Sequence, residues 1–141
     1  MAYFWLNQRE NYRGYGDVEG EVYHYRSNVP GHRKLSAGDL FVYYRPGEYV
    51  LFGGGTIGEI VIKKADSEEE GGGLTEYYAH VDEYHEVDPP IPVRDIKDEI
   101  SFLKDRDGLR GVPQNSIYEI DRADFEAIVV AAGIEDLLPG E

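Results

Sequence analysis

The first expected strand carries aromatic and amide side chains in an order that suits the binding of a flat ring. Residues 3–5 are all aromatic, and amides follow at Asn7 and its neighbour. Aromatic faces can hold a planar ring, and amides can hydrogen-bond to its polar edge. Trp5 and Asn7 are two apart in a strand and share one face, so we expect them to face a ligand. Phe4 and Leu6 would then point the other way, into the core.

The rest of this half of the chain adds residues of the same kinds. Eight of the 12 tyrosines lie in residues 1–64. Cations in or beside expected loops could bind phosphates, and they are Arg9, Arg13, Arg26, Arg33 and Lys34. Together these groups are the parts of a pocket for a nucleobase taken out of its stack. The alternative is that the rings simply fill the core of a small barrel, and composition leaves both interpretations open.

A glycine motif in the middle of the chain has a different explanation. Gly53, Gly55 and Gly58 satisfy the dinucleotide pattern G-x-G-x-x-G, which requires a helix N-terminus to follow it. The segment that follows reads GEIVIKK, with branched residues at alternate positions, and this pattern predicts a strand. We therefore interpret the glycines as a bulge, or as a place where another group approaches the backbone closely.

Catalytic and metal-binding patterns are missing from the sequence. The chain has no cysteine, which excludes disulfides, thiolate metal ligands and a cysteine nucleophile. His80 and His85 are five apart and would point to opposite faces of a strand. Asp105 and Asp107 suggest a calcium loop, but its other ligands are absent. We expect no metal, no cofactor and no enzymatic activity.

The charge is distributed unevenly along the chain. The net charge is −14, of which residues 65–141 carry −15 and residues 1–64 carry +1. So many carboxylates with few lysines are typical of proteins that work in concentrated salt, although an ordinary acidic surface is the alternative. The N-terminal sequence has neither a basic segment nor a long apolar run, so we expect a soluble cytoplasmic protein without a membrane span.

The spacing of apolar residues predicts strands first and helices last. Its length of 141 residues fits one domain, spanning residues 1–141. Residues 49–65 read as two apolar runs around a glycine bend, and 94–103 as a helix with Ile96, Ile100 and Leu103 on one face. A second helix would run from an N-cap at Asp121 to Gly133. The other expected strands are 3–8, 21–27, 39–45, 74–87 and the short segment 116–120. These elements predict an α+β fold, mainly an antiparallel sheet curled into a barrel with two or more helices against it.

Five segments together resemble a known family. They are YFWLNQ, VYHYRSN, KLSAGDLFVYYR, FGGGTIGEI and SIYEIDRADFEAIVVAAG. In order and spacing the chain resembles the N-terminal modules of certain prokaryotic HNH-type restriction endonucleases, which look like EVE and YTH domains of the PUA-like superfamily. The resemblance runs from Tyr3 to Gly133 and is weakest in 64–90. It implies a small twisted β-barrel flanked by helices.

The resemblance also implies a function and a site. It implies that the chain flips a modified base of double-stranded DNA, such as a methylated cytosine or adenine, into an aromatic pocket as part of host defence. Trp5 would form a wall and Asn7 would read the base edge, while the glycines would let the ring approach the backbone. Only one of Tyr43 and Tyr44 can face the pocket, since they lie on opposite faces of a strand. The implied pocket residues are Trp5, Asn7, Tyr25, Ser27, Asn28, Tyr43, Phe52, Gly53 and Gly54.

The chain departs from this family at its end. No HNH nuclease motif follows the expected second helix, so the resemblance implies a reader that does not cut DNA alone and works with a fused or separate nuclease. Two other functions remain open. One is a PUA-like RNA-binding module, and the other is an acidic protein–protein adaptor without a base pocket.

Overall fold

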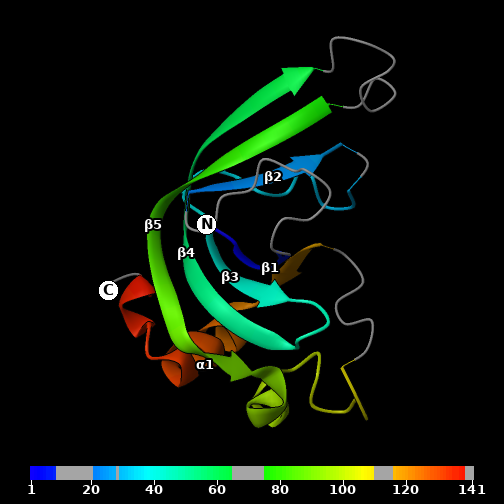
Figure 1. Cartoon of the computed structure of the whole chain (residues 1–141), viewed down its shortest axis with the longest axis vertical. Helices are drawn as coiled ribbons and strands as arrows, with labels where there is room; N and C mark the ends of the chain where they lie inside the picture. The colour runs from blue at the N-terminus through cyan, green and yellow to red at the C-terminus, as the bar shows by residue number, and fades with distance from the viewer. Residues whose placement is uncertain (9–20, 28, 65–74, 110–115, 139–141) are drawn as a thin grey trace.

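Two long strands, β4 (Val50–Lys64) and β5 (Thr75–Pro92), pair along their length and bend together through the whole molecule (Figure 1). The computed structural model describes residues 1–8, 21–27, 29–64, 75–109 and 116–138. Within these residues the six strands form one mixed sheet in the order β2-β5-β4-β3-β1-β6. The other strands are β1 (Tyr3–Asn7), β2 (Val22–Arg26), β3 (Leu40–Arg45) and β6 (Ile117–Ile120).

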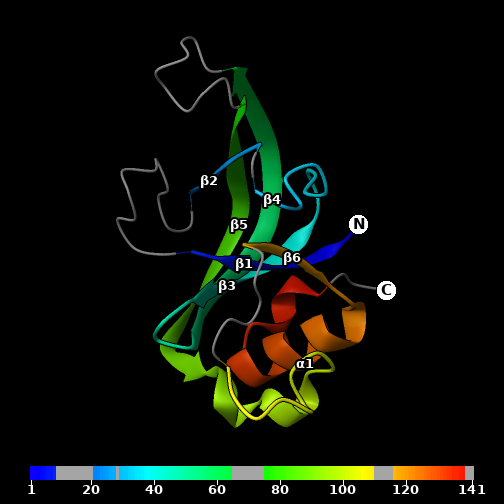
Figure 2. The same ribbon diagram turned by 90° about the vertical axis from the view of Figure 1, so that its right-hand side faces the viewer.

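The sheet is a curled half-barrel. Strands β1 and β3 are parallel, and every other neighbouring pair is antiparallel. The β4–β5 register shifts at three places, the last two between Thr56 and Ile60, and such irregularities bend a sheet. Beyond that bend β5 pairs with β2 on its other edge. Figure 2 shows β1 and β6 between β2 on one side and α1 (Arg122–Ala132) on the other.

Both faces of the central strands are covered, which explains the apolar run in β1. Phe4 and Leu6 belong to one buried cluster and Trp5 to another, on the opposite face. A strand buried on both faces reads as a continuous apolar run rather than an alternating one. The adjacent aromatics of residues 3–5 therefore have a structural explanation.

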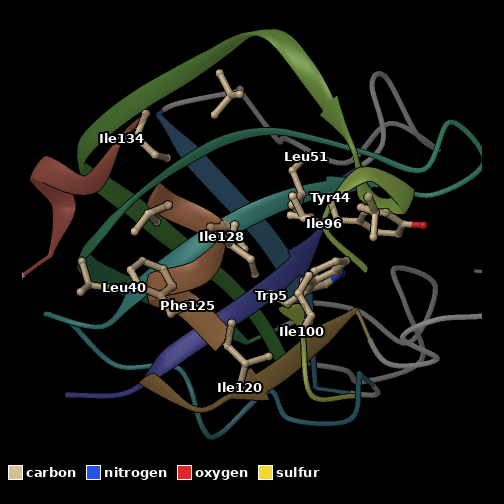
Figure 3. Close-up of a cluster of buried hydrophobic side chains, with 14 of the residues drawn as sticks. Trp5, Leu40, Tyr44, Leu51, Ile96, Ile100, Ile120, Phe125, Ile128 and Ile134 are labelled. Carbon is tan, nitrogen blue, oxygen red and sulfur yellow. The ribbon is translucent and has the colours of Figure 1, made fainter. Parts of the chain in front are cut away.

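The two clusters are named here by their place in the sheet. The concave cluster lies toward β2, and its buried members are Phe4, Leu6, Tyr23, Tyr25, Leu35, Phe41, Tyr43, Phe52, Ile57, Ala79 and Ile117. The helix-side cluster lies toward α1 and includes Trp5, Leu40, Tyr44, Leu51, Ile96, Ile100, Ile120, Phe125, Ile128 and Ile134 (Figure 3). The remaining members of the helix-side cluster are Val42, Val87, Val93, Leu103, Val129 and Leu137.

Helix α1 forms where the sequence predicts it. The Asp121 side chain accepts a hydrogen bond from the Asp124 backbone N–H at 2.8 Å, as an N-cap does. The helix ends at Gly133, whose φ of 73° is the left-handed conformation that glycine adopts most easily. Both predicted helix ends are confirmed. A short 3-10 helix, η4 (Glu135–Leu137), follows.

The predicted helix at 94–103 is wrong. That segment contains the 3-10 helices η2 (Val93–Asp95) and η3 (Lys97–Glu99), separated by Ile96 at φ −123°. The Ser101 N–H makes a tertiary hydrogen bond instead of a helical one. It donates to the Asp124 carboxylate at 2.8 Å. Residues 96, 100 and 103 are still all buried, so their spacing predicted burial correctly and the helix incorrectly. Within the described residues α1 is the one α-helix, where two or more were expected.

The glycine segment does not break the strand. Residues 50–64 form the single strand β4, which continues through Gly53–Gly55 without interruption. The β3–β4 register shifts beside this segment, between Tyr43 and Tyr44, so the predicted bulge is confirmed, and the two predicted apolar runs belong to one strand. Because β4 continues as a strand, no helix N-terminus follows the glycines to bind a pyrophosphate.

Candidate functional site

A continuous row of aromatic rings crosses the concave cluster. Tyr43 stacks on Phe52 with ring centroids 5.5 Å apart and lies 6.1 Å from Tyr23. The Tyr23 ring centroid is 5.8 Å from that of Tyr25. The Tyr25 ring stacks on Tyr77 with centroids 5.0 Å apart and an angle of 3° between the ring planes. His32 follows at 5.6 Å from Tyr77. We call these six residues, Phe52, Tyr43, Tyr23, Tyr25, Tyr77 and His32, the aromatic row.

The exposure of this row rises toward one end. Tyr43, Phe52, Tyr23 and Tyr25 are 0–3% exposed, whereas Tyr77 and His32 are partly exposed. The buried rings are therefore already covered by protein on their faces. A ligand would meet the row at its Tyr25–Tyr77 end, or at the edges of the buried rings.

The end of β1 lies against the aromatic row. The Tyr23 hydroxyl donates to the backbone carbonyl of Asn7 at 3.0 Å and is 3.3 Å from that of Ser116. The Gln8 N–H donates a hydrogen bond to the Tyr44 carbonyl at 2.9 Å. This bond holds Gln8, the last residue of the described segment 1–8, against β3. Because side chains alternate along a strand, Gln8 points to the same face as Phe4 and Leu6.

Four polar atoms in this region are buried without a hydrogen-bond partner among the residues that the structure describes. They are Gln8 Oε1 and Tyr25 Oη on the concave side, and Trp5 Nε1 and Asn7 Oδ1 on the helix side. Leaving a buried polar group unsatisfied costs about 1–3 kcal/mol, so such groups need an explanation. A ligand that brings its own donors and acceptors to the end of β1 would supply one.

The hydroxyl of Tyr25 is a neutral hydrogen-bonding group. Burial raises its pKa well above the usual value, and the nearby Tyr77 hydroxyl raises it further. The group therefore keeps its proton at any physiological pH and can donate to an acceptor on a ligand.

Trp5 is a core residue rather than the open wall that we expected. Its side chain is 1% exposed, and its ring lies 4.9 Å from Tyr44 and 5.4 Å from Phe102. In Figure 3 its indole nitrogen points away from α1, as does the Tyr44 hydroxyl. Trp5 and Asn7 do share a face, but the helix-side cluster covers the ring. Only the polar edge of the indole is left to make a new contact.

The expected close approach at the glycines is made by the chain itself. A Cβ on Gly53 would lie 2.2 Å from Tyr84 Oη, so the Tyr84 ring rests where a side chain would be. A Cβ on Gly54 would lie 3.0 Å from both Ile134 Cδ1 and the Phe41 carbonyl oxygen. The protein's own groups therefore occupy the positions that we assigned to a ligand ring.

The remaining predicted pocket residues fall into three groups. Tyr43 and Phe52 belong to the aromatic row, and the Arg45 guanidinium lies 4.1 Å from the Phe52 ring centre. Ser27 closes the β2–β5 pairing, since its N–H donates to the Thr75 carbonyl at 2.9 Å and its Oγ accepts from the Thr75 N–H at 3.0 Å. Asn28 lies outside the described residues, as do the predicted phosphate ligands Arg9 and Arg13.

The other predicted phosphate ligands differ in their surroundings. Arg26 Nε lies 3.1 Å from Glu76 Oε1, and its side chain is on the face of β2 opposite Tyr25. The Arg26 charge is thus already paired. Arg33 and Lys34 are exposed in the turn that contains His32, next to the accessible end of the aromatic row.

Several residues of this site were not among the predicted ones. Gln8 was noticed as an amide, and its alternation with Phe4 and Leu6 could have placed it on the concave side. Tyr77 and Tyr84 come from β5, where register shifts prevent a simple alternation rule from assigning the face. His32 lies in a turn, and no sequence pattern places it beside Tyr77.

Other kinds of site find no support in the described part of the chain. It contains no group of three or more His, Cys, Asp or Glu side chains able to hold a metal ion. Among its helices, none is both long enough and apolar enough to cross a membrane.

Comparison with solved structures identifies the fold. Protein Atu2648 of Agrobacterium tumefaciens has a TM-score of 0.64 at 12% identity, over 99% of this chain and 97% of that one. Rpa0253 of Rhodopseudomonas palustris has a TM-score of 0.58 at 15% identity, over 99% and 97%. An ASCH structure from Zymomonas mobilis has a TM-score of 0.58 at 14% identity, over 92% and 94%.

These similarities show that the chain has the α+β fold of ASCH and PUA-like domains. The predicted fold class is therefore confirmed. No protein-family model matches the sequence, and no curated protein sequence matches it significantly. The narrower resemblance, to EVE- and YTH-like readers of restriction endonucleases, stays a prediction.

Proposed function

We propose that this chain is a nucleic-acid-binding module that reads one modified base, a methylated cytosine or adenine, in double-stranded DNA. The base would leave its stack and enter at the end of β1, beside the accessible end of the aromatic row. Flipping suits this site because the polar atoms are buried, and an edge in an intact duplex could not reach them. The ASCH and PUA-like fold of the chain is compatible with this function.

The observation that carries the proposal is two buried atoms without partners among the described residues, Gln8 Oε1 just past the end of β1 and Tyr25 Oη on a stacked ring of the aromatic row. Gln8 Oε1 can accept a hydrogen bond from the exocyclic amine of cytosine or adenine. The Tyr25 hydroxyl can donate to a ring nitrogen or a carbonyl oxygen. The rings beside them offer an apolar surface to a methyl group, so an added methyl would gain contact.

Arg33 and Lys34 would hold the DNA backbone. Both are exposed beside His32, at the end of the row where a base would enter. Contacts to phosphate position the duplex without reading its sequence. The net charge of −14 opposes DNA binding, so affinity would depend more on stacking and edge contacts than on counterion release. Such a binder should lose less affinity with added salt than a basic one.

A binding titration tests the proposal. Labelled duplexes that differ at one base, unmodified, 5-methylcytosine or N6-methyladenine, are titrated at low and high salt and followed by fluorescence polarisation. One edge contact is worth about 1–3 kcal/mol, so we expect the preferred duplex to bind roughly five to a hundred times more tightly. A modified single-stranded RNA that binds better than every duplex would assign the chain to RNA. Failure to bind any nucleic acid would reject the proposal in favour of a protein-binding adaptor.

Two substitutions locate the reading groups. Gln8→Leu and Tyr25→Phe remove the unpartnered atoms and keep most of the side-chain volume. Each removes one edge contact and should weaken binding of the preferred modified duplex by roughly five- to a hundredfold, while the free energy of unfolding stays equal or rises. Tyr78→Phe is the matched control, because Tyr78 follows Tyr77 in β5 but stacks on His24 on the other face. An equal loss of affinity in the control, or no loss in the two variants, contradicts the assignment.

We also propose that the chain does not cut DNA, and that a fused or separate HNH nuclease does so. The pure chain should leave modified and unmodified plasmids intact with Mg²⁺ or Mn²⁺. Metal-dependent cleavage that a single carboxylate substitution abolishes would overturn this part of the proposal.

A further inference from the structure

A second concave feature lies at the β3–β4 turn. It is a surface hollow of about 590 Å³, a volume within the range of small-molecule sites. Its lining residues are Glu48, Tyr49, Val50, Pro92, Arg94, Gly108 and Leu109. The lining therefore combines one aromatic ring and aliphatic groups with a single cation and a single carboxylate.

Tyr49 holds an unusual backbone conformation at the edge of this hollow. Its φ is 59°, and no other described non-glycine residue has a positive φ. The conformation is fixed from both sides, since the Tyr49 N–H donates to the Arg45 carbonyl at 3.0 Å and its carbonyl accepts from the Val93 N–H at 2.9 Å. Bulky residues rarely adopt this conformation, and asparagine or glycine would fit it better. The side chain is also 38% exposed, so burial does not explain why a tyrosine is there.

Arg94 supplies an unused positive charge. It is exposed and has no ion-pair partner among the described residues, although it lies in the half of the chain with a net charge of −15. Glu48 is different, because its carboxylate lies 3.5 Å from Arg45 Nε. Among the described residues, the hollow thus presents one cation without an ion-pair partner, Arg94, together with the ring of Tyr49, and this pairing suits an anionic group attached to a flat ring.

The hollow lies close to the end of β1. Asn7 pairs with Tyr44, and the chain reaches Glu48 and Tyr49 a few residues later along β3 and its turn. Figure 2 shows the end of β1 and the β3–β4 turn on the same side of the molecule. Arg45 links the two places, since its guanidinium lies over Phe52 of the aromatic row and beside Glu48 of the hollow.

We propose that this hollow binds a single nucleotide, the one next to the base that enters at the end of β1. Its base would stack on Tyr49, and its phosphate would pair with Arg94. This proposal rests on the proposed function, and it adds a second contact that is independent of the modification. The module would then recognise two neighbouring nucleotides, one by its modified edge and one by stacking and charge.

The first experiment probes the hollow without any long nucleic acid. The full chain is titrated with dCMP, dAMP and 2-deoxyribose 5-phosphate, and the methyl signals of Leu109 and Val50 are followed by NMR. We expect both nucleotides to shift these signals at millimolar concentrations, and the base-free sugar phosphate to shift them less. Tyr49→Phe should preserve the response because it keeps the ring, and Tyr49→Asn should remove it while the chain unfolds at the same or a higher temperature. Nucleotides that shift no signal at the hollow overturn the proposal.

The second experiment separates this proposal from the proposed function. Two modified duplexes are compared, one intact and one with abasic sites on both sides of the modified base. Stacking of one base is worth roughly a five- to hundredfold change in affinity, so Tyr49→Asn should weaken the intact duplex by that factor and leave the abasic one unchanged. Equal effects on both duplexes, or none on the intact one, overturn the proposal.

A third experiment removes the positive charge of Arg94 to test its pairing with a phosphate. Arg94→Gln should weaken the intact and abasic duplexes equally and reduce the salt dependence by about one phosphate contact. Arg106→Gln is the matched control, because Arg106 is an exposed arginine of the same segment that does not line the hollow. If the chain binds no modified duplex at all, the proposed function fails, and the NMR titration still decides whether the hollow takes a nucleotide.

Discussion

The two buried clusters of this protein differ in chemistry although one sheet separates them. Among the described residues, six of the eleven buried members of the concave cluster are aromatic, against three of the sixteen on the helix side. Aliphatic side chains interdigitate without polar atoms, so packing alone satisfies most of the helix-side cluster, and among the described residues Trp5 Nε1 is the exception there. Tyrosines bring hydroxyls into the core, and each hydroxyl needs a partner.

The difference indicates a division of roles. The helix-side cluster joins α1 to the sheet with mainly aliphatic side chains, whereas the concave cluster is built mainly from aromatic rings. Among the described residues both sides keep two buried polar atoms without partners, and on the concave side these are the Tyr25 hydroxyl and Gln8 Oε1. Natural sequences depart from full polar satisfaction mainly at functional sites. We infer that the helix side stabilises the fold and that the concave side contributes less stability than its size suggests.

The largest expected effect is a loss of stability on the helix side. Phe125 is fully buried in that cluster and lies 5.1 Å from the Tyr3 ring. Phe125→Ala should lower the free energy of unfolding by about 3–5 kcal/mol, measured by urea denaturation. The control is Val130→Ala on the same helix, where a side chain that is 60% exposed should contribute little. Similar losses in both variants would contradict the assigned role of this cluster.

A smaller loss of stability is expected from adding a side chain at Gly53 of the glycine segment. Gly53→Ala forces the Tyr84 ring to move and should lower the free energy of unfolding by about 1–3 kcal/mol. In a Tyr84→Ala background the same change should cost less than about 0.5 kcal/mol, since the clash is gone. Gly108→Ala is the control, because nothing lies within 4 Å of its added Cβ. An undiminished loss in the Tyr84→Ala background would mean that the glycine is needed for another reason.

Alkaline pH should affect one tyrosine on each face. Burial raises the pKa of Tyr44 to about 12, with a smaller contribution from Tyr49, and it raises the pKa of Tyr25 as well. Each hydroxyl is harder to ionise in the folded state than in the unfolded state. Its contribution to the free energy of unfolding is therefore complete below pH 10 and is lost above it. Stability should fall by about 1.4 kcal/mol per pH unit for each tyrosine between pH 10 and 12. Urea denaturation at several pH values measures the slope of the free energy of unfolding against pH. Tyr25→Phe and Tyr44→Phe should each remove the part of this slope that one tyrosine causes. An unchanged slope would argue against burial of that hydroxyl.

The smallest expected effect concerns two arginines, Arg26 at the end of β2 and Arg33 in the turn that follows it. Arg33→Gln should weaken all duplexes by about twofold to fivefold and lower the salt dependence by about one phosphate contact. Arg26→Gln should change binding less, because Glu76 already pairs with that side chain. Polarisation titrations over a range of salt concentrations measure both. A larger effect at Arg26 would place the DNA on the outer face of β2 and refute the concave site.

Local signals in the sequence determined the strands and the last helix. Short runs of aromatic and branched residues placed β1, β2 and β3 within a residue or two, and Asp121 and Gly133 marked both ends of α1. These predictions succeeded because capping and strand alternation depend on near neighbours in the chain. The spacing of Ile96, Ile100 and Leu103 predicted their burial but not their conformation, because Asp124, more than twenty residues away, captures the Ser101 amide.

The candidate site was only partly determined by the sequence. Composition indicated that aromatic and amide groups of the first half would form it, and Tyr25, Tyr43 and Phe52 do lie in one row. Which rings are covered was decided by tertiary packing. Trp5 is buried because Phe102 and Tyr44 close over it, and Gly53 is occupied because register shifts bring Tyr84 across from β5. A strand pattern states that a residue faces one side of a sheet, but only the folded chain determines whether that side is filled by its own residues.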